Sequence, residues 1–348
     1  MLGPLMIDVA GLALDAEDRE LLRHPAVGGL ILFARNYADP AQVAALVREV
    51  HALREPRLLV AVDHEGGRVQ RFRDGFTHLP PMRACGRDFE HAPRPALARA
   101  EQVGWLIGAE LRAVGIDLAF APVLDLDFGV SGVIGDRAFH RQPDAVSRLA
   151  VAVVHGMKRA GMAATGKHFP GHGGIAADSH LELPVDPRPY ADLAAADLVP
   201  FQRLVDAGLP SVMMAHVVYP AVDPLPASFS PRWIRTELRG AFDFRGAVFC
   251  DDLCMAGAKA IGDPLARAEA ALAAGCDMLP VCNDRAAAVA VIAGLRVEPD
   301  ATRQLRLTRL HGRAAPGDLA ALRDSPEWRA AIAELAALDP APTLALDA

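Results

Sequence analysis

The sequence predicts an α/β protein, a single (β/α)8 barrel of the TIM type. Short apolar runs rich in β-branched residues alternate with Ala-, Leu- and Arg-rich segments of helical spacing. The runs occupy residues 5–9, 29–33, 58–63, 117–122, 163–168, 211–216, 247–251 and 278–282. Strands that alternate with helices predict parallel βαβ units, and eight of them predict closure into a barrel. An open, doubly wound parallel sheet is the alternative architecture.

The length and the C-terminal part of the chain agree with one barrel. The 348 residues exceed the usual domain size, as barrels with insertions often do. From about residue 285 onward, helical patterns at 286–295, 300–311 and 318–338 predict helices that cap or flank the barrel. No repeat or low-complexity linker occurs. Residues 1–348 are therefore expected to form one catalytic domain.

Polar residues stand at the ends of five of the apolar runs. They are Asp63, Asp125, Lys167 with His168, His216, and Asp251 with Asp252. The carboxyl ends of parallel strands form one face of a barrel, and active sites are built at that face. The sequence therefore predicts that five strands deliver ionisable groups to a single mouth.

Composition restricts the partners and the compartment. The net charge of −7, from 36 basic and 43 acidic residues, leaves no basic footprint for nucleic acid or acidic membranes. The sequence contains no uninterrupted apolar stretch of about 18 residues, so it predicts no membrane-spanning helix. Residues 1–8 lack the basic start of a signal peptide. Five cysteines without a Cys-x-x-Cys pair argue against a disulfide framework or a zinc ribbon. We expect a cytoplasmic protein with a small-molecule substrate.

Residues 166–182 form the most unusual segment of the chain. They place three histidines, one lysine and two acids among four glycines and a proline, a density of breakers that predicts a loop. Asp178 and His180 are two residues apart, so in a loop they can lie together, and the carboxylate can orient the imidazole and favour its protonated form. A surface Asp–His pair on a loop is the alternative interpretation.

Asp251 and Asp252 follow an apolar run directly. Successive side chains of a strand point in opposite directions, so only one carboxylate is expected to enter the barrel mouth as a nucleophile or base. The alternative is a helix N-cap, because an aspartate at a strand-to-helix turn caps well.

Two other chemistries are open for the same segments. His168, His172, His180 and Asp178 provide the nitrogen and oxygen groups of a hydrolytic metal site, although their spacing matches no helical His pair. Lys167 at a strand end could instead form a Schiff base, as in barrel aldolases.

Residues 63–71 form a second dense polar turn, with the sequence Asp-His-Glu-Gly-Gly-Arg-Val-Gln-Arg. The paired glycines permit a tight backbone, and Arg71 can make fork-shaped hydrogen bonds to ligand oxygens. Arg137 is a further loop arginine, within residues 135–139. A mixture of acids and bases suits a polyol, whose hydroxyls both donate and accept. Structural salt bridges are the alternative for each arginine.

Several of these stretches together resemble glycoside hydrolase family 3, and within it the single-domain bacterial β-N-acetylhexosaminidases. The matching stretches are residues 63–72, 135–139, 166–180, 215–217 and 249–255, in order, with Glu182 and Pro184. The Lys-His-Phe-Pro-Gly-His-Gly run followed by Asp-x-His is specific to this subgroup. The resemblance covers roughly residues 1–330.

The resemblance implies a role for each matching residue. Asp251 matches the family nucleophile, His180 the unusual histidine acid/base, and Asp178 its partner. The sugar-binding positions are matched by Asp63, Arg71, Arg137, Lys167 and His168. Cys250 and Cys254 stand where relatives often have serine, and Met214 where some have proline, but no catalytic group is lost.

The implied activity is that of a retaining exo-β-N-acetylglucosaminidase that acts through a covalent glycosyl-Asp251. The resemblance implies peptidoglycan fragments as substrates, GlcNAc-1,6-anhydroMurNAc and its peptides, in cell-wall recycling. We also expect a monomer without cofactor or metal. Three other functions remain as alternatives: a β-N-acetylglucosaminide phosphorylase, a non-catalytic sugar sensor and the lysine-dependent aldolase.

Overall fold

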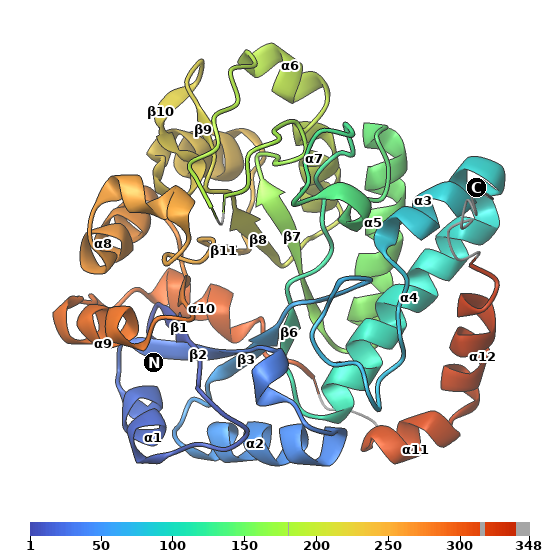
Figure 1. Ribbon diagram of the computed structural model, residues 1–348, viewed down its shortest axis with the longest axis horizontal. Coiled ribbons are helices and arrows are strands. Elements are labelled where there is room, and N and C mark those ends of the chain that lie inside the picture. The colour runs from blue at the N-terminus through green and yellow to red at the C-terminus, as the bar shows by residue number, and fades with distance from the viewer. Residues whose placement is uncertain (180, 314–316, 339–348) are drawn as a thin grey trace, which may run out of the picture.

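Eight parallel strands form the centre of the molecule (Figure 1). The computed structural model describes residues 1–179, 181–313 and 317–338. The strands are β1 (Leu5–Ile7), β2 (Val27–Leu32), β3 (Leu59–Val62), β6 (Leu118–Ala119), β7 (Ala163–Phe169), β8 (Ser211–Met214), β11 (Ala247–Phe249) and β12 (Leu279–Val281). Their order in the sheet is β11-β8-β7-β6-β3-β2-β1-β12, and a parallel bridge between Phe249 and Met278 joins the two ends. The predicted barrel is confirmed, and the open sheet is wrong.

Helices surround the strands. They are α1 (Ala16–Arg23), α2 (Pro40–Ala52), α3 (Met82–His91), α4 (Pro93–Ala113), α5 (Pro143–Arg159), α6 (Tyr190–Ala195), α7 (Leu198–Asp206), α8 (Pro264–Ala274), α9 (Arg285–Gly294), α10 (Ala301–Thr308), α11 (Leu319–Asp324) and α12 (Pro326–Leu335). Aspartate side chains accept the first free backbone N–H groups of several of them, including Asp15 at α1 and Asp39 at α2. The late helices α11 and α12 pack against α4 at the edge of the barrel (Figure 1).

The alternation of strand side chains separates two cores. Leu59 and Ala61 of β3 belong to a cluster of residues from six strands that fills the barrel, whereas Val60 and Val62 pack outward under the helices. In β11, Ala247 and Phe249 take the inward positions in the same way. Continuing this alternation by two residues aims Asp63, after β3, and Asp251, after β11, into the barrel mouth.

Two expectations from the sequence differ from the structure. The loop expected over residues 166–182 begins later, because its first four residues belong to β7; among its remaining described residues no helix or strand occurs. The single helix expected over 318–338 is wrong. It is divided into α11 and α12 at Ser325, whose side chain accepts the N–H of Trp328, with Pro326 as the first residue of α12.

Within the described residues, none of the helices has both the length and the apolar character that crossing a bilayer requires.

Two glycines allow α4 and α5 to pack in backbone contact. A Cβ on Gly104 would lie 2.0 Å from the carbonyl oxygen of Val153, and one on Gly156 would lie 2.0 Å from that of Glu101. We therefore expect Gly156→Ala to lower the free energy of unfolding by about 2–3 kcal/mol, because the helices must separate. Urea unfolding measures the loss. Gly132→Ala is the control, since a Cβ there meets nothing within 4 Å; equal losses in both variants would contradict the explanation.

Candidate active site

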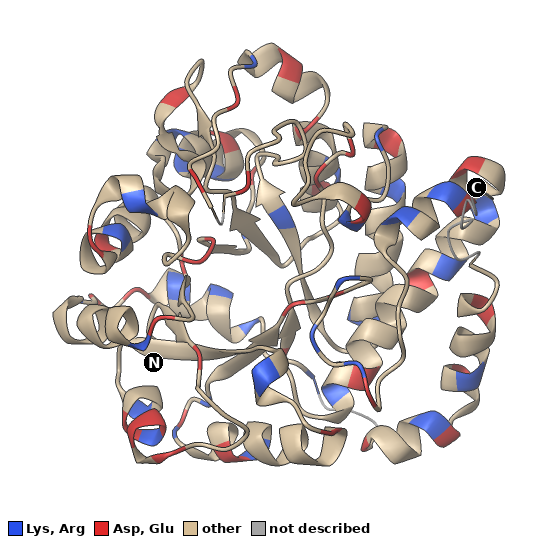
Figure 2. Ribbon diagram, viewed as in Figure 1, with Lys and Arg blue, Asp and Glu red and all other residues tan. Residues whose placement is uncertain are grey.

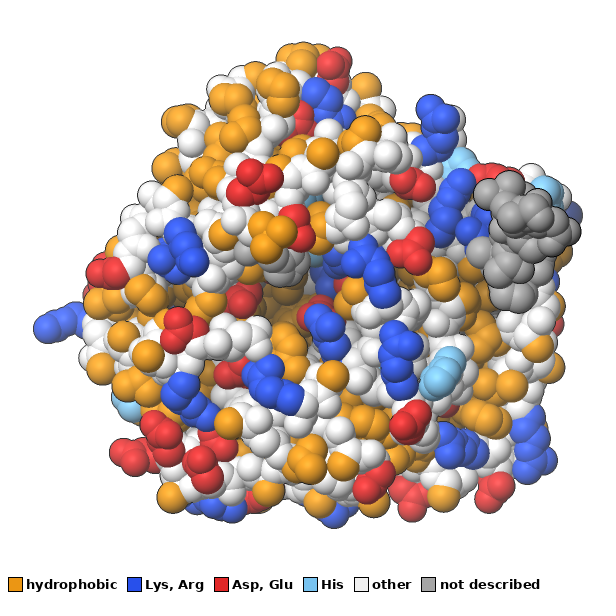
Figure 3. Space-filling model, in the orientation of Figure 1, with side chains coloured by type: hydrophobic (Ala, Val, Ile, Leu, Met, Phe, Trp, Pro, Cys, Tyr) orange, Lys and Arg blue, Asp and Glu red, His pale blue; other side chains and the backbone are white. Residues whose placement is uncertain are grey.

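A cavity of about 470 Å³ opens at the carboxyl ends of the strands. Figure 2 shows acidic and basic positions along the loops around the centre of the barrel, and Figure 3 shows the mouth as a hollow among charged and hydrophobic side chains. Its floor is formed by Ile31, Phe120 and Met213 of the inner core. The ionisable residues that line it are Asp63, Glu65, Arg68, Arg71, Arg137, Lys167, His168, His172, Asp251 and Asp252.

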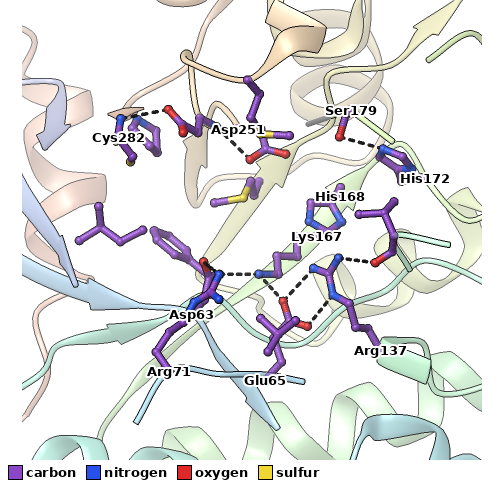
Figure 4. A pocket seen from close by; sticks show the side chains of 18 of the residues that line it. Asp63, Glu65, Arg71, Arg137, Lys167, His168, His172, Ser179, Asp251 and Cys282 are labelled. Carbon is purple, nitrogen blue, oxygen red and sulfur yellow. Dashed lines mark hydrogen bonds and ion pairs between the residues drawn. The ribbon is translucent and has the colours of Figure 1, made fainter. Parts of the chain in front are cut away.

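Lys167 forms the centre of a buried ionic network (Figure 4). Its ammonium lies 2.8 Å from Oδ1 of Asp63 and 2.6 Å from Oε1 of Glu65. Burial alone would lower the pKa of Lys167, but the two carboxylates outweigh burial and raise it. Burial likewise opposes ionisation of Asp63, yet Lys167 and Arg71 hold its pKa below the ordinary value. The network is therefore fully charged at neutral pH.

Two arginines extend this network from either side. The Arg137 guanidinium binds both oxygens of Glu65, at 2.8 and 2.9 Å, in the two-pronged geometry that gives the strongest carboxylate pairs. Arg71 reaches Asp63 at 3.5 Å and remains one-third exposed. The result is a cavity wall of fixed charges whose remaining donor and acceptor positions are available to the hydroxyls of a ligand.

Asp125 fixes the start of the loop after β7. Its carboxylate pairs with Nδ1 of His168 at 2.7 Å and accepts the backbone N–H of His172, also at 2.7 Å. Burial would raise the pKa of Asp125, but His168 and His172 hold it below the ordinary value. Because Asp125 occupies one nitrogen of the His168 ring, the other nitrogen is left for the cavity, which His168 lines.

The two neighbouring aspartates have different surroundings. Asp252 accepts the backbone N–H groups of Cys254 and Cys282 through one oxygen, each at 3.0 Å, and so ties the loop after β11 to β12. Asp251 continues the inward alternation of Ala247 and Phe249, and its Oδ1 accepts the N–H of Asp252 at 2.9 Å. Both carboxylates border the cavity. The carboxylate of Asp252 holds two backbone segments together, whereas that of Asp251 follows the strand positions that point into the barrel.

We expect Asp252→Asn to stabilise the protein above neutral pH. Burial, with the negative charges of Asp251 and Asp8, raises the pKa of Asp252 from 3.8 to about 7. Because the folded form binds this proton more tightly, the resulting stability is complete below about pH 4 and is lost as pH rises through about 7. Asparagine stays neutral and still accepts both N–H groups. Thermal unfolding should show a gain on the order of 2 kcal/mol at pH 8 and almost none at pH 4; equal gains at both pH values would contradict this origin.

The loop that carries Asp178 is held at both ends. Nε2 of His172 lies 3.1 Å from Oγ of Ser179, and the carbonyl of Ser179 accepts the N–H of Gly257 at 3.0 Å. The carbonyl of Asp178 accepts the N–H groups of Leu181 and Glu182, so the chain turns back at this point. His180 lies outside the described residues, and its pairing with Asp178 stays a prediction.

The structure brings most of the predicted site residues into one cavity. Lining residues include Asp63, Arg71, Arg137, Lys167, His168 and Asp251. Sequence reasoning left out Glu65, which joins Lys167 to Arg137, and it named Asp125 only as a strand-end acid. Glu65 stands two residues after Asp63, the spacing that puts extended side chains on one face, and this signal could have identified it.

The Schiff-base alternative conflicts with the surroundings of Lys167. An amine must lose its proton to attack a carbonyl, and the two carboxylates favour the protonated form instead. The metal alternative depended in part on His180. Within the described residues, no group of three His, Cys, Asp or Glu side chains converges in a way that could hold a metal ion.

A barrel with a carboxylate at its mouth and a cavity wall of polar residues that can bind hydroxyl groups is typical of glycoside hydrolases. A model of the glycosyl hydrolase family 3 N-terminal domain matches residues 5–309, and the chain belongs to this family. The chain is 56% identical to a beta-hexosaminidase of Thioalkalivibrio sulfidiphilus, with 99% of each chain covered. It is also 56% identical to a beta-hexosaminidase of Thiobacillus denitrificans, over 97% of this chain and 94% of that one.

Solved structures give the same result. NagZ from Neisseria gonorrhoeae in complex with N-trifluoroacetyl-D-glucosamine superposes with a TM-score of 0.92 at 43% identity, over 97% of this chain and 98% of that chain. A family 3 beta-N-acetylglucosaminidase from Paenibacillus has a TM-score of 0.77 at 35% identity, over 94% of this chain and 62% of that chain. The protein is thus a glycoside hydrolase of the NagZ type, with beta-hexosaminidase function.

Proposed function

We propose that the protein is a retaining exo-β-N-acetylglucosaminidase that releases terminal GlcNAc from peptidoglycan fragments, GlcNAc-1,6-anhydroMurNAc and its peptides, during cell-wall recycling. The observation that carries the proposal is the inward position of Asp251 in the same cavity as the network of Asp63, Glu65, Arg137 and Lys167. We further propose that the enzyme works as a monomer in the cytoplasm, where its five free thiols would stay reduced.

The proposed reaction has two displacements. The carboxylate of Asp251 attacks the anomeric carbon, and His180, protonated and oriented by Asp178, donates its proton to the departing glycosidic oxygen. A covalent glycosyl-Asp251 results. In the second step His180 takes a proton from water, and the water oxygen attacks the anomeric carbon and releases Asp251. Each step inverts the carbon, so the product sugar keeps the β configuration.

The cavity wall supplies the binding part of this proposal. Asp63 and Glu65 accept hydrogen bonds from sugar hydroxyls, while Lys167, Arg71 and Arg137 donate to sugar oxygens. Because these charges already hold one another in place, little reorganisation is needed when a sugar enters. A histidine as the proton donor avoids a second negative charge beside Asp251, which suits fragments that themselves bear carboxylates.

Phosphorolysis is the second candidate, because a histidine acid/base repels an incoming phosphate less than a carboxylate would. The deciding experiment follows turnover of 4-nitrophenyl N-acetyl-β-D-glucosaminide with and without phosphate, with the released sugar identified by NMR. Hydrolysis predicts β-GlcNAc at a rate independent of phosphate. Acceleration by phosphate with GlcNAc 1-phosphate as product would identify a phosphorylase, and binding without turnover would identify a sugar sensor.

A further inference from the structure

Arg188 stands outside the cavity and joins two buried carboxylates behind the loop of residues 171–179. Its guanidinium lies 2.6 Å from Oδ2 of Asp186 and 2.8 Å from Oδ2 of Asp197, with further contacts of 3.0 and 3.1 Å to the same side chains. Both carboxylate side chains are only 1% exposed. The ring of Phe128 packs on the guanidinium, with the centroid 5.1 Å from Cζ.

The loop backbone rests directly on this cluster. A Cβ added at Gly174 would lie 2.5 Å from Nη2 of Arg188 and 2.8 Å from its Cζ, so the glycine packs flat against the guanidinium. A Cβ at Gly171, whose φ is +149°, would lie 2.8 Å from Oδ1 of Asp197. The cluster of Asp186, Arg188 and Asp197 therefore forms part of the surface on which the middle of the loop rests.

Other contacts hold the loop near its ends and also beside Gly174, where a Cβ on Gly173 would lie 1.9 Å from the carbonyl oxygen of Leu126 and where Ile175 is buried in the core. The hydroxyl of Tyr219 donates to the carbonyl of Gly171, Asp125 accepts the N–H of His172, and Gly257 donates to the carbonyl of Ser179. Gly174 lies between these anchors, and Asp178 follows it by four residues. A shift of the guanidinium would be transmitted to the segment that carries the proposed acid/base pair.

We propose that Arg188 is a positioning residue: its guanidinium supports the backbone at Gly174 and thereby places Asp178, and through it His180, for proton donation. The inference rests on the proposed function, since it assigns Arg188 no role unless that loop delivers the proton. Burial raises the pKa of Asp197 to about 6, although Arg188 opposes the shift. Loss of the guanidinium therefore leaves two buried carboxylates that must rearrange.

A misplaced proton donor has a specific kinetic signature. Departure of 2,4-dinitrophenolate needs little protonation, whereas departure of phenolate needs a correctly placed acid. Arg188→Met should therefore lower kcat/KM for phenyl N-acetyl-β-D-glucosaminide by about tenfold or more and change it little for the 2,4-dinitrophenyl substrate. A general loss of folded structure would lower both values equally.

The experiment compares these two substrates in four variants, with thermal unfolding of each. Arg188→Lys keeps a charge between the carboxylates without the flat surface beneath Gly174, so it preserves the fold if the methionine variant does not. It should show the same leaving-group bias, which is a larger loss of kcat/KM for the phenyl substrate than for the 2,4-dinitrophenyl substrate. Arg203→Met is the matched control, because Arg203 pairs with Asp144 at an exposed site and should show no bias. His180→Ala tests the proposed function itself.

The outcomes are distinct. A bias in His180→Ala and in the Arg188 variants, without one in Arg203→Met, supports the inference. A bias in His180→Ala alone overturns the role of Arg188 and leaves the proposed function standing. Absence of bias in His180→Ala rejects the acid/base assignment, and the role of Arg188 with it. As a check from the loop side, Gly174→Ala should show the bias when Arg188 is present and add little in the Arg188→Met background.

Discussion

Asp251→Asn is expected to reduce kcat for an aryl N-acetyl-β-D-glucosaminide by at least about 1,000-fold, with the protein fully folded. The amide has nearly the same shape as the carboxylate and still accepts the N–H of Asp252 through its oxygen. It cannot form the covalent bond to the anomeric carbon, nor stabilise the positive charge that develops there. Steady-state kinetics measures the loss, and circular dichroism monitors the fold.

Asp252→Asn is the matched control for this result, because the same chemical change is made one residue along the chain. Its carboxylate is engaged with the N–H groups of Cys254 and Cys282, which an amide oxygen can also accept. We expect it to keep kcat within about tenfold of wild type. If instead Asp252→Asn removed turnover and Asp251→Asn did not, the two roles would have to be exchanged.

Lys167→Met is expected to have the largest effect on stability, a loss of about 3–5 kcal/mol in the free energy of unfolding, together with loss of turnover. The Lys167 side chain is 3% exposed, and its ammonium sits between Asp63 and Glu65 at hydrogen-bond distance. Methionine fills a similar volume but leaves the two carboxylates facing each other across a buried site, where Arg71 and Arg137 are the described cations that still pair with them. Denaturant unfolding measures the change.

A compensating variant tests the electrostatic cause. In Lys167→Met/Asp63→Asn the charge of one carboxylate is removed along with that of the lysine, so part of the lost stability should return while turnover stays low. Lys158→Met is the control for the lysine itself, since Lys158 is exposed at the end of α5. If the double variant is no more stable than Lys167→Met, unpaired charge is not the source of the loss.

The sequence specified the barrel because its determinants are local. Each apolar run is a strand, since a parallel barrel buries both faces of its strands and therefore needs continuous apolar residues. The alternation that aims Leu59 and Ala61 inward also directs Asp63, and the same reasoning separates Asp251 from Asp252. The helix expected over 318–338 failed for a local reason as well: Ser325 and Pro326 form a cap and a helix start that outweigh the helical periodicity.

What the sequence by itself determined is the fold class, the face on which the site lies and most of the polar side chains delivered to it. What only the tertiary structure decided is which of these groups touch. Lys167 meets a carboxylate 104 positions earlier in the chain, and Glu65 binds an arginine 72 positions later. Arg188 lies behind the loop that it supports, where no motif points to it. Periodicity encodes the direction of a side chain, whereas partners at such separations are set by the register and packing of the closed barrel.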